Sequence, residues 1–230
     1  MSTESYRTDR PDLCKDNSWS KLYAHRRAAA ARFGPIHALP IVRRVREVVL
    51  GEIRRDANVL EVGAGGGRLG MWIARLRPQA HYESMDVDPA GEHDYASLDD
   101  IRRQYDLVVA LEVIEHLSLA EIGPWLRRLR DLTLPGGLMI LSTPNTFYPP
   151  AYLRDATHRT PLCYDELAGL VAAAGFDVLR LARVYHDPWP RRLARRYLFG
   201  WLFRLLGFDF ARQIVLVARR PSAASAAPSP

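Results

Sequence analysis

This chain of 230 residues has little cysteine and almost no lysine. Cys14 and Cys163 stand far apart in the sequence, so neither a disulfide framework nor a cysteine-rich metal site is expected. No apolar run free of charge reaches the roughly 18 residues of a membrane-spanning helix. The opening MSTESYRTDR is too polar for a signal peptide. These absences leave a reducing cytoplasm as the expected location.

Positive charge is unevenly spread along the chain. The formal net charge is +6, yet residues 180–220 alone carry ten arginines against two aspartates. The rest of the chain is therefore slightly acidic, and the basic character belongs to one C-terminal patch. Such a patch is either a solvated surface or a site for an anionic partner.

Apolar periodicity divides the chain into alternating helices and strands. A polar segment at 1–17 is expected to be flexible, and the low-complexity tail at 221–230 to be disordered. Helices are expected at 18–33, 36–52, 68–76, 119–132 and 165–174, and strands at 59–62, 81–87, 105–111, 138–142, 178–184 and 214–218.

The alternation predicts an α/β fold with a mainly parallel sheet covered by helices on both faces. Ligands of such sheets bind beyond the carboxyl ends of the strands. The last two strands lack a crossover helix between them, so we expect an antiparallel edge pair joined by an insertion at about 185–212.

A glycine-rich loop follows the first clear strand, in NVLEVGAGGG at 58–67. Glycine lets the backbone turn sharply and approach a ligand closely. Gly65, Gly67 and Gly70 also fit a dinucleotide fingerprint, so the glycines decide little alone. Glu61 decides more, because a carboxylate repels a pyrophosphate but attracts a ligand that carries an ammonium and a sulfonium. A glycine-rich turn without a ligand is the alternative.

Five motifs occur together in order: VLEVGAGGG, MDVD, YDLVVALEVIEHL, LPGGLMILSTPN and ELAGLVAAAGFDV. This set resembles the class I S-adenosylmethionine-dependent methyltransferases, over about residues 40–185 and the last strand. The resemblance implies a Rossmann-like, doubly wound, mainly parallel seven-stranded sheet with an antiparallel last strand. It also implies a single methyltransferase domain at 18–220, whose N-terminal helices form a lid on the acceptor side.

The resemblance further implies where the cofactor S-adenosyl-L-methionine binds. In that family the glycine loop holds the methionine part, an acid after the second strand takes the ribose hydroxyls, and the following residues flank the adenine. The positions that match are Glu61, Gly63, Ala64, Gly65, Gly67, Asp86, Val87, Leu98, Leu111 and Glu112. The stretch between Asp88 and Tyr105 is short, so the family's third helix is expected to be reduced or missing.

Acidic and imidazole side chains follow the strand at 105–111. Glu112, Glu115 and His116 have three- and four-residue spacings, which place them on one face of a helical turn. They could form a charged first turn, supply a general base, or bind Mg²⁺ or Mn²⁺. The sequence leaves these three alternatives open.

The same stretch is similar to the ubiquinone-pathway O-methyltransferases and to the metal-dependent small-RNA 2′-O-methyltransferases. His158, beyond the strand that ends in STPN, supplies a second histidine. We expect His116, His158 and Glu115 to be catalytic. A divalent metal would be held by Glu112, Glu115, His116 and His158, but none is expected. The dense histidine cluster and RNA-binding region of the RNA enzymes are missing, so nucleic acid is not an expected partner.

The segment 187–210, DPWPRRLARRYLFGWLFRLLGFDF, combines arginine with large apolar side chains at helical spacing. Gly200 and Gly207 interrupt it, which predicts two short helices. The segment could lie in a membrane interface, cap an apolar acceptor pocket, form a dimer face, or pack as ordinary core.

The sequence therefore predicts a methyltransferase that O-methylates a small or lipid-linked apolar molecule. The alternatives are a metal-dependent RNA 2′-O-methyltransferase and a cofactor-binding scaffold without catalysis, with a nicotinamide oxidoreductase a distant third. A peripheral membrane contact through 187–210 would be compatible with the cytoplasmic location. The oligomeric state is left open.

Overall fold

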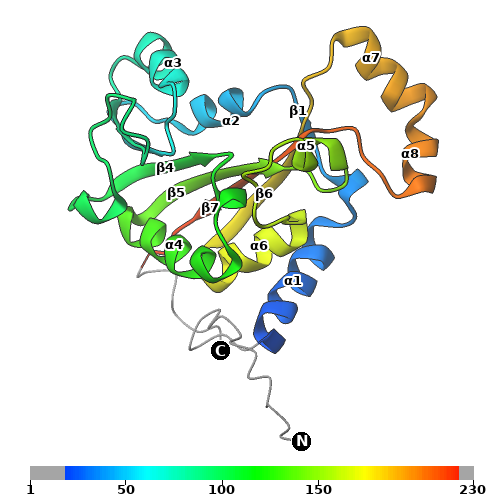
Figure 1. The fold of residues 1–230 in the computed structure, drawn as a ribbon, viewed down its shortest axis with the longest axis horizontal. Coiled ribbons are helices and arrows are strands. Elements are labelled where there is room, and N and C mark those ends of the chain that lie inside the picture. The colour runs from blue at the N-terminus through cyan, green and yellow to red at the C-terminus, as the bar shows by residue number, and fades with distance from the viewer. Residues whose placement is uncertain (1–18, 223–230) are drawn as a thin grey trace, which may run out of the picture.

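A computed structural model describes residues 19–222; the segment predicted to be flexible at 1–17 lies outside that range, as does the tail predicted to be disordered at 221–230 except for its first two residues. Seven strands form one sheet in the order β1-β6-β7-β5-β4-β2-β3 (Figure 1). The strands are β1 (Ile41–Val42), β2 (Asn58–Val62), β3 (His81–Met85), β4 (Tyr105–Leu111), β5 (Thr133–Pro144), β6 (Asp177–Val184) and β7 (Gln213–Arg219). The predicted α/β class and the seven-stranded sheet are confirmed.

Helices cover both faces of the sheet, because alternate strand residues feed two separate apolar cores. In β4, Val108 and Ala110 belong to one core, whereas Leu107 and Val109 belong to the other. α4 (Leu119–Leu132), α6 (Tyr164–Ala173) and α1 (Trp19–Phe33) close the first core. α2 (Val45–Glu52) and α3 (Arg68–Leu76) close the second (Figure 1).

The single helix predicted at 36–52 is wrong. The structure instead has a short 3₁₀ turn at Ile36–Ala38, strand β1, and then α2. Pro40 explains the break, because a proline disfavours helical backbone at the residue before it and lacks an N–H donor. β1 pairs in parallel with β6 at the edge of the sheet, where Ile41 lies opposite Arg183.

The last strand is antiparallel, as predicted, but β6 and β7 do not form an edge pair. β7 is inserted between β5 and β6 and is antiparallel to both. β7 is therefore buried on both sides within the sheet, and five of its residues, 214–218, are buried. The edge position that the sequence assigned to this pair belongs to β1.

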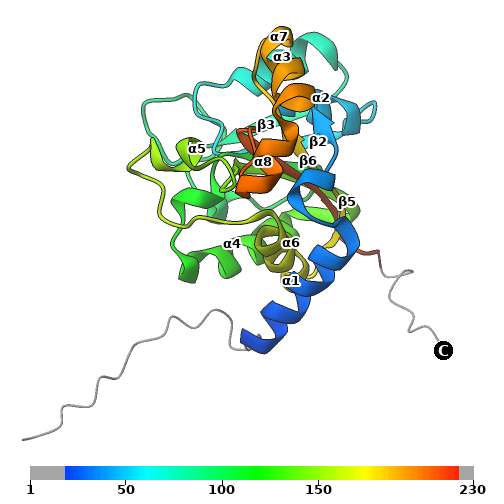
Figure 2. The same cartoon turned by 90° about the vertical axis from the view of Figure 1, so that its right-hand side faces the viewer.

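The segment between β6 and β7 projects from the body beyond the edge of the sheet (Figures 1 and 2). It contains α7 (Trp189–Leu193), a π-helical turn (Ala194–Leu198) and α8 (Gly200–Leu206), so the predicted short helical pieces are confirmed. Gly207 ends α8 with a left-handed φ of 70°. We call residues 187–210 the arm. No helix within the described residues is both long and apolar enough to cross a membrane.

α1 packs along α6 (Figure 2), and Arg26 Nε lies 2.8 Å from a carboxylate oxygen of Asp165. Gly169 lets the two helices approach, because a Cβ there would come within 3.0 Å of the Arg26 backbone nitrogen. The lid role expected of the N-terminal helices stays a prediction.

Candidate active site

The glycine loop joins β2 to α3 at the carboxyl end of the sheet. Gly63, Gly65 and Gly67 have φ of 74°, 49° and 65°, a region that residues with a Cβ rarely adopt. At Gly63 a Cβ would also lie 2.4 Å from Cγ2 of Val113. Glycine is therefore required at this position by conformation and by space, and the loop backbone is left bare toward solvent.

Asp86 follows β3 and faces this loop. Its carboxylate accepts hydrogen bonds from the Gly65 N–H at 2.7 Å and from the Asp88 N–H at 2.9 Å. Partial burial raises the pKa of Asp86, but these backbone hydrogen bonds outweigh burial and hold the pKa below its ordinary value. Asp86 therefore presents a carboxylate anion at the rim of the loop.

Glu61 lies beneath the loop, at the end of β2, and is only 5% exposed. Burial raises the pKa of Glu61 to about 7, although the hydrogen bond donated by the Tyr82 hydroxyl opposes the shift. The nearby charge of Asp86 raises this pKa further. A cationic ligand beside Glu61 would restore its ionised form.

Glu112 marks the end of β4 with a left-handed φ of 57°, which is rare for a residue with a side chain. Its backbone N–H donates to the Ser142 carbonyl at 3.1 Å, and its carboxylate accepts from the Ser142 hydroxyl at 2.8 Å. Burial raises the pKa of Glu112. The neighbouring strand β5 thus stabilises a strained backbone turn.

Glu115 is completely buried in a 3₁₀ turn, Ile114–His116. One carboxylate oxygen accepts from the Thr143 hydroxyl at 3.2 Å, while Oε1 has no hydrogen-bond partner. Burial and the adjacent charge of Glu112 raise the pKa of Glu115 to about 8. Buried carboxylate oxygens without a partner are uncommon in folded proteins, which makes Glu115 a candidate for a functional group.

His116 and His158 meet with their ring centroids 5.0 Å apart. Nδ1 of His158 lies 2.7 Å from the Tyr152 carbonyl, and Nδ1 of His116 lies 3.3 Å from the Thr157 carbonyl. Because a carbonyl only accepts, each Nδ1 donates a proton to its carbonyl, and Nε2 of His158 lies 3.9 Å from Oδ2 of Asp155. Glu115, His116 and His158 each bring one ligand atom within 4.8 Å of the others.

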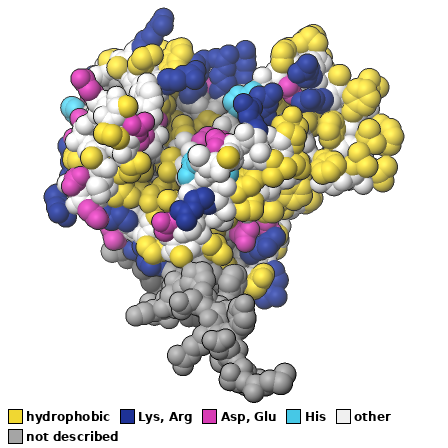
Figure 3. Space-filling model, in the orientation of Figure 1, with side chains coloured by type: hydrophobic (Ala, Val, Ile, Leu, Met, Phe, Trp, Pro, Cys, Tyr) yellow, Lys and Arg dark blue, Asp and Glu magenta, His cyan; other side chains and the backbone are white. Residues whose placement is uncertain are grey.

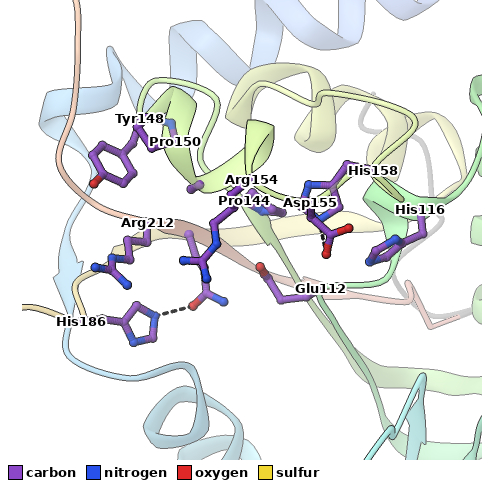
Figure 4. A pocket seen from close by; sticks show the side chains of 12 residues that line it. Glu112, His116, Pro144, Tyr148, Pro150, Arg154, Asp155, His158, His186 and Arg212 are labelled. Carbon is purple, nitrogen blue, oxygen red and sulfur yellow. Dashed lines mark hydrogen bonds and ion pairs between the residues drawn. The ribbon is translucent and has the colours of Figure 1, made fainter.

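These histidines face a cavity of about 370 Å³ at the carboxyl ends of β4, β5 and β6 (Figure 4). Its lining residues come from five parts of the chain and are Glu112, His116, Pro144, Tyr148, Pro150, Ala151, Arg154, Asp155, His158, His186, Arg212 and Gln213. Figure 4 shows His158 and His116 at one end of the cavity and His186 at the other. His186 Nε2 lies at hydrogen-bond distance, 2.7 Å, from the side-chain oxygen of Gln213.

A family model described as a methyltransferase domain matches residues 23–181, well over half of the chain. The chain belongs to the S-adenosylmethionine-dependent methyltransferases. A ubiquinone biosynthesis O-methyltransferase of Azorhizobium caulinodans is 31% identical over 205 residues, covering 68% of this chain and 78% of the relative. The enzyme of the same name from Ruegeria pomeroyi is 30% identical over 207 residues, covering 77% and 75%.

Solved structures agree on the fold of this methyltransferase. A SAM-dependent methyltransferase from Archaeoglobus fulgidus superposes with a TM-score of 0.60 at 14% identity, over 88% of this chain and the whole of the other. At that identity the likeness concerns the fold alone. The cofactor S-adenosyl-L-methionine follows from the family, and the bare loop at Gly63 with carboxylates at Glu61 and Asp86 fits its cationic amino-acid end and its ribose.

The structure brings most of the predicted cofactor residues of the methyltransferase to one edge of the sheet. The glycine loop, Glu61 and Asp86 adjoin one another, whereas Val87 is 79% exposed and Leu98 begins a 3₁₀ turn, Leu98–Asp100. That turn is the only helical piece between β3 and β4, a stretch described throughout, so the prediction of a reduced or missing third helix is confirmed. Which cofactor atoms each residue touches stays a prediction.

Only three of the four candidate metal ligands of the methyltransferase lie together. Glu115, His116 and His158 form a cluster, but Glu112 lies outside it and bonds Ser142 instead. Within the described residues this trio is a fit for a cation through one carboxylate and two imidazoles. The catalytic candidates Glu115, His116 and His158 are thus together in space.

Sequence reasoning missed the other half of the cavity. Arg154, Arg212 and His186 line it, and neither arginine has an acidic partner anywhere in residues 19–222. His186 and Arg212 stand where the arm leaves and rejoins the body. The sequence did contain a clue to these residues. His186 and Arg212 flank the predicted insertion, and loop residues at the carboxyl ends of strands are placed to contact a ligand.

Proposed function

We propose that this methyltransferase O-methylates a hydroxyl of a small apolar or lipid-linked molecule in the cavity at Glu112 and His158. The observation that carries the proposal is the pair of imidazoles, each oriented at Nδ1 by a backbone carbonyl, that line a 370 Å³ cavity at the carboxyl ends of the strands. A cavity of that size fits a small ring system or a sugar unit.

His158 is the proposed general base. When bound, the cofactor supplies an electrophilic methyl group on its sulfonium sulfur, which an acceptor oxygen can take by in-line displacement. The hydrogen bond to the Tyr152 carbonyl fixes the tautomer of His158, so that Nε2 is free to accept the hydroxyl proton. Its side chain is only 7% exposed, which keeps bulk water from the base.

His116 and Glu115 support this base. His116 presents a second imidazole. An imidazolium, once formed, would be stabilised by the Asp155 carboxylate, 3.9 Å from Nε2 of His158, and would favour the ionised form of the adjacent Glu115 carboxyl. The same trio could instead hold a divalent cation that lowers the pKa of the acceptor hydroxyl. The proposed reaction needs no metal, and a chelation experiment separates the two.

The proposed acceptor class is a phenolic hydroxyl on a lipid-linked ring. Two relatives are named for ubiquinone biosynthesis O-methylation, which supports that class for this chain. Arg154 and Arg212 would add affinity for an acceptor that carries an anionic group. A lipid-linked acceptor would also place the enzyme at a membrane surface, as a peripheral protein.

The test is to incubate the enzyme with trideuteromethyl S-adenosylmethionine and lipid extracts, and to locate the label by mass spectrometry. We expect label on oxygen of an extractable apolar product, unchanged by EDTA. His158→Gln should lower kcat by about 10²–10⁴-fold with cofactor binding intact, whereas His81→Gln, an exposed histidine, should not. Label on RNA that requires Mn²⁺ would contradict the proposal, and so would cofactor binding with no labelled product.

A further inference from the structure

The arm carries most of the exposed large apolar side chains among the described residues. Eight of its side chains are 44–73% exposed: Trp189, Tyr197, Leu198, Phe199, Trp201, Leu205, Leu206 and Phe208. Five others are scattered over the rest of the described chain. Figure 3 shows hydrophobic side chains gathered over the projecting lobe of α7 and α8. Contiguous apolar surface of this kind marks an interaction site.

Three of the five arginines of the arm have no acidic partner among the described residues. Asp187 is taken by Arg195 at 2.7 Å and Arg191 at 3.9 Å. The other acid, Asp209, is buried and paired with Arg183 of β6, so it neutralises nothing on the arm. Arg192, Arg196 and Arg204 have no ion pair within residues 19–222. The exposed apolar surface is therefore accompanied by uncompensated positive charge.

Two of these arginines share a small cavity. Arg192 and Arg196 line a space of about 230 Å³ with Ile41, Leu193 and Tyr197. Guanidinium groups bind phosphate oxygens in a two-pronged manner. The apolar walls suit the glycerol and first methylenes of a lipid. Tyr197 is 72% exposed, so the cavity adjoins the apolar surface of the arm.

The arm is held against the body at its C-terminal foot. Phe203 of α8 packs on Phe210 with ring centroids 5.1 Å apart, and Phe210 packs on Tyr185 at 4.3 Å. The Asp209 N–H donates to the Phe147 carbonyl at 2.8 Å. These contacts fix the direction in which the exposed side chains project.

We propose that the arm docks the enzyme on a bilayer containing anionic phospholipids. Trp189, Trp201 and Leu205 would enter the acyl boundary, while Arg192 and Arg196 bind a headgroup phosphate. A second copy of the chain fits the surface of the arm less well than a bilayer does, because a two-fold contact would bring the same unpaired arginines together. RNA also fits this surface less well than a bilayer does, because RNA binding would not account for the exposed leucine and phenylalanine side chains.

Docking would serve the acceptor cavity, a consequence that rests on the proposed function. His186 and Arg212 line that cavity and flank the two ends of the arm. A bilayer under the arm would therefore lie beside the cavity, within reach of a lipid-linked acceptor. The docking itself depends only on the arm.

The test is sedimentation with phosphatidylcholine vesicles, with and without phosphatidylglycerol. We expect binding to the anionic vesicles, weakened by salt, and a blue shift of tryptophan fluorescence. The double variant Arg192→Gln with Arg196→Gln should bind at least about tenfold more weakly, since each arginine near the surface contributes about 1 kcal/mol. Trp201→Ala with Leu205→Ala should do the same.

The controls are residues of matched type elsewhere. Arg75→Gln with Arg102→Gln removes two exposed arginines, and Met71→Ala removes an exposed apolar side chain; both should bind like wild type. Cofactor affinity should be unchanged in every variant, so failure of docking and failure of methyl transfer are distinguishable. Absent vesicle binding, equal binding of the arm variants and wild type, or a dimer lost with Trp201→Ala would overturn the proposal.

Discussion

At the scale of single residues, the site depends on backbone that only certain neighbours permit. Gly63 has no room for a Cβ because Val113 lies against it, and Val113 follows Glu112, whose φ is left-handed. The glycine loop and the end of β4 therefore fit together as one unit. The sequence showed the glycines, but the strained turn at Glu112 has no sequence signal.

Asp86→Ala tests the ribose assignment. Removing the carboxylate leaves ribose hydroxyls without their acceptor, which should weaken S-adenosylmethionine binding by about 1–3 kcal/mol. Titration calorimetry measures this change, and Asp100→Ala, an exposed aspartate on the next 3₁₀ turn, is the matched control. Equal affinities for the Asp86 variant and wild type would remove the assignment.

Glu61 predicts a pH dependence of cofactor binding. Its pKa is about 7 without a ligand, and a bound ammonium group needs the ionised form. Affinity should therefore rise about tenfold between pH 5.5 and 7, with proton release near pH 6. In Glu61→Gln the affinity should be lower and nearly flat over this range. A pH-independent wild type would contradict the pairing.

The raised pKa of Glu61 also predicts that the stability of the cofactor-free protein falls as pH rises, whereas cofactor affinity increases. The pKa is raised from an ordinary value of 4.5, so between pH 4.5 and 7 the folded state holds a proton that the unfolded state has lost. The contribution of Glu61 to the free energy of unfolding is thus complete below pH 4.5 and falls as pH rises to 7. Urea unfolding should show wild type losing stability relative to Glu61→Gln across this window.

At the scale of helices and strands, long periodic segments were predictable and short ones were not. α3, α4, α6 and the six longer strands lie close to where apolar periodicity places them, although β5 begins at Thr133 and not at the predicted residue 138. β1 has two residues, too few for any period, and its partner β6 is about 140 residues away in sequence. The helix predicted across it ignored Pro40. The position of β7 inside the sheet is likewise a matter of tertiary pairing that sequence spacing does not encode.

The buried ion pair between β6 and the arm predicts a large stability effect. Arg183 and Asp209 lie 3.0 Å apart with side chains 7% and 0% exposed. Asp209→Ala leaves the guanidinium uncompensated and should cost about 3–5 kcal/mol in the free energy of unfolding. The control Glu52→Ala breaks the exposed pair with Arg180 and should cost under about 1 kcal/mol. If urea unfolding gave similar losses of unfolding free energy for both variants, burial of the Arg183–Asp209 pair would not increase its contribution to stability.

At the scale of the whole molecule, the enzyme combines a complete three-layer fold with a projecting arm. The residues predicted to bind the cofactor lie on or directly after β2, β3 and β4, which follow one another in sequence, so sequence motifs were enough to name them. The proposed acceptor half draws residues from the 3₁₀ turn Ile114–His116, the end of β5, α5 (Pro149–Leu153), the segment after β6 and the start of β7. These segments are distant in sequence and meet only in the folded protein. The sequence therefore did not identify Arg154, His186 and Arg212 as residues of the cavity.

The division of the molecule into a three-layer fold and a separate arm can be tested by a deletion. Residues 189–207 are removed, and Pro188 is joined to Phe208 through a short glycine–serine linker. Among the arm residues removed, only Phe203 packs on an apolar core within the described structure. β6 and β7 already pair as antiparallel neighbours, and a shorter loop between them costs less entropy. The free energy of unfolding should therefore fall by no more than about 2 kcal/mol, less than one large core truncation, and calorimetry should find cofactor affinity unchanged. Loss of folding would instead make the arm part of the domain's core.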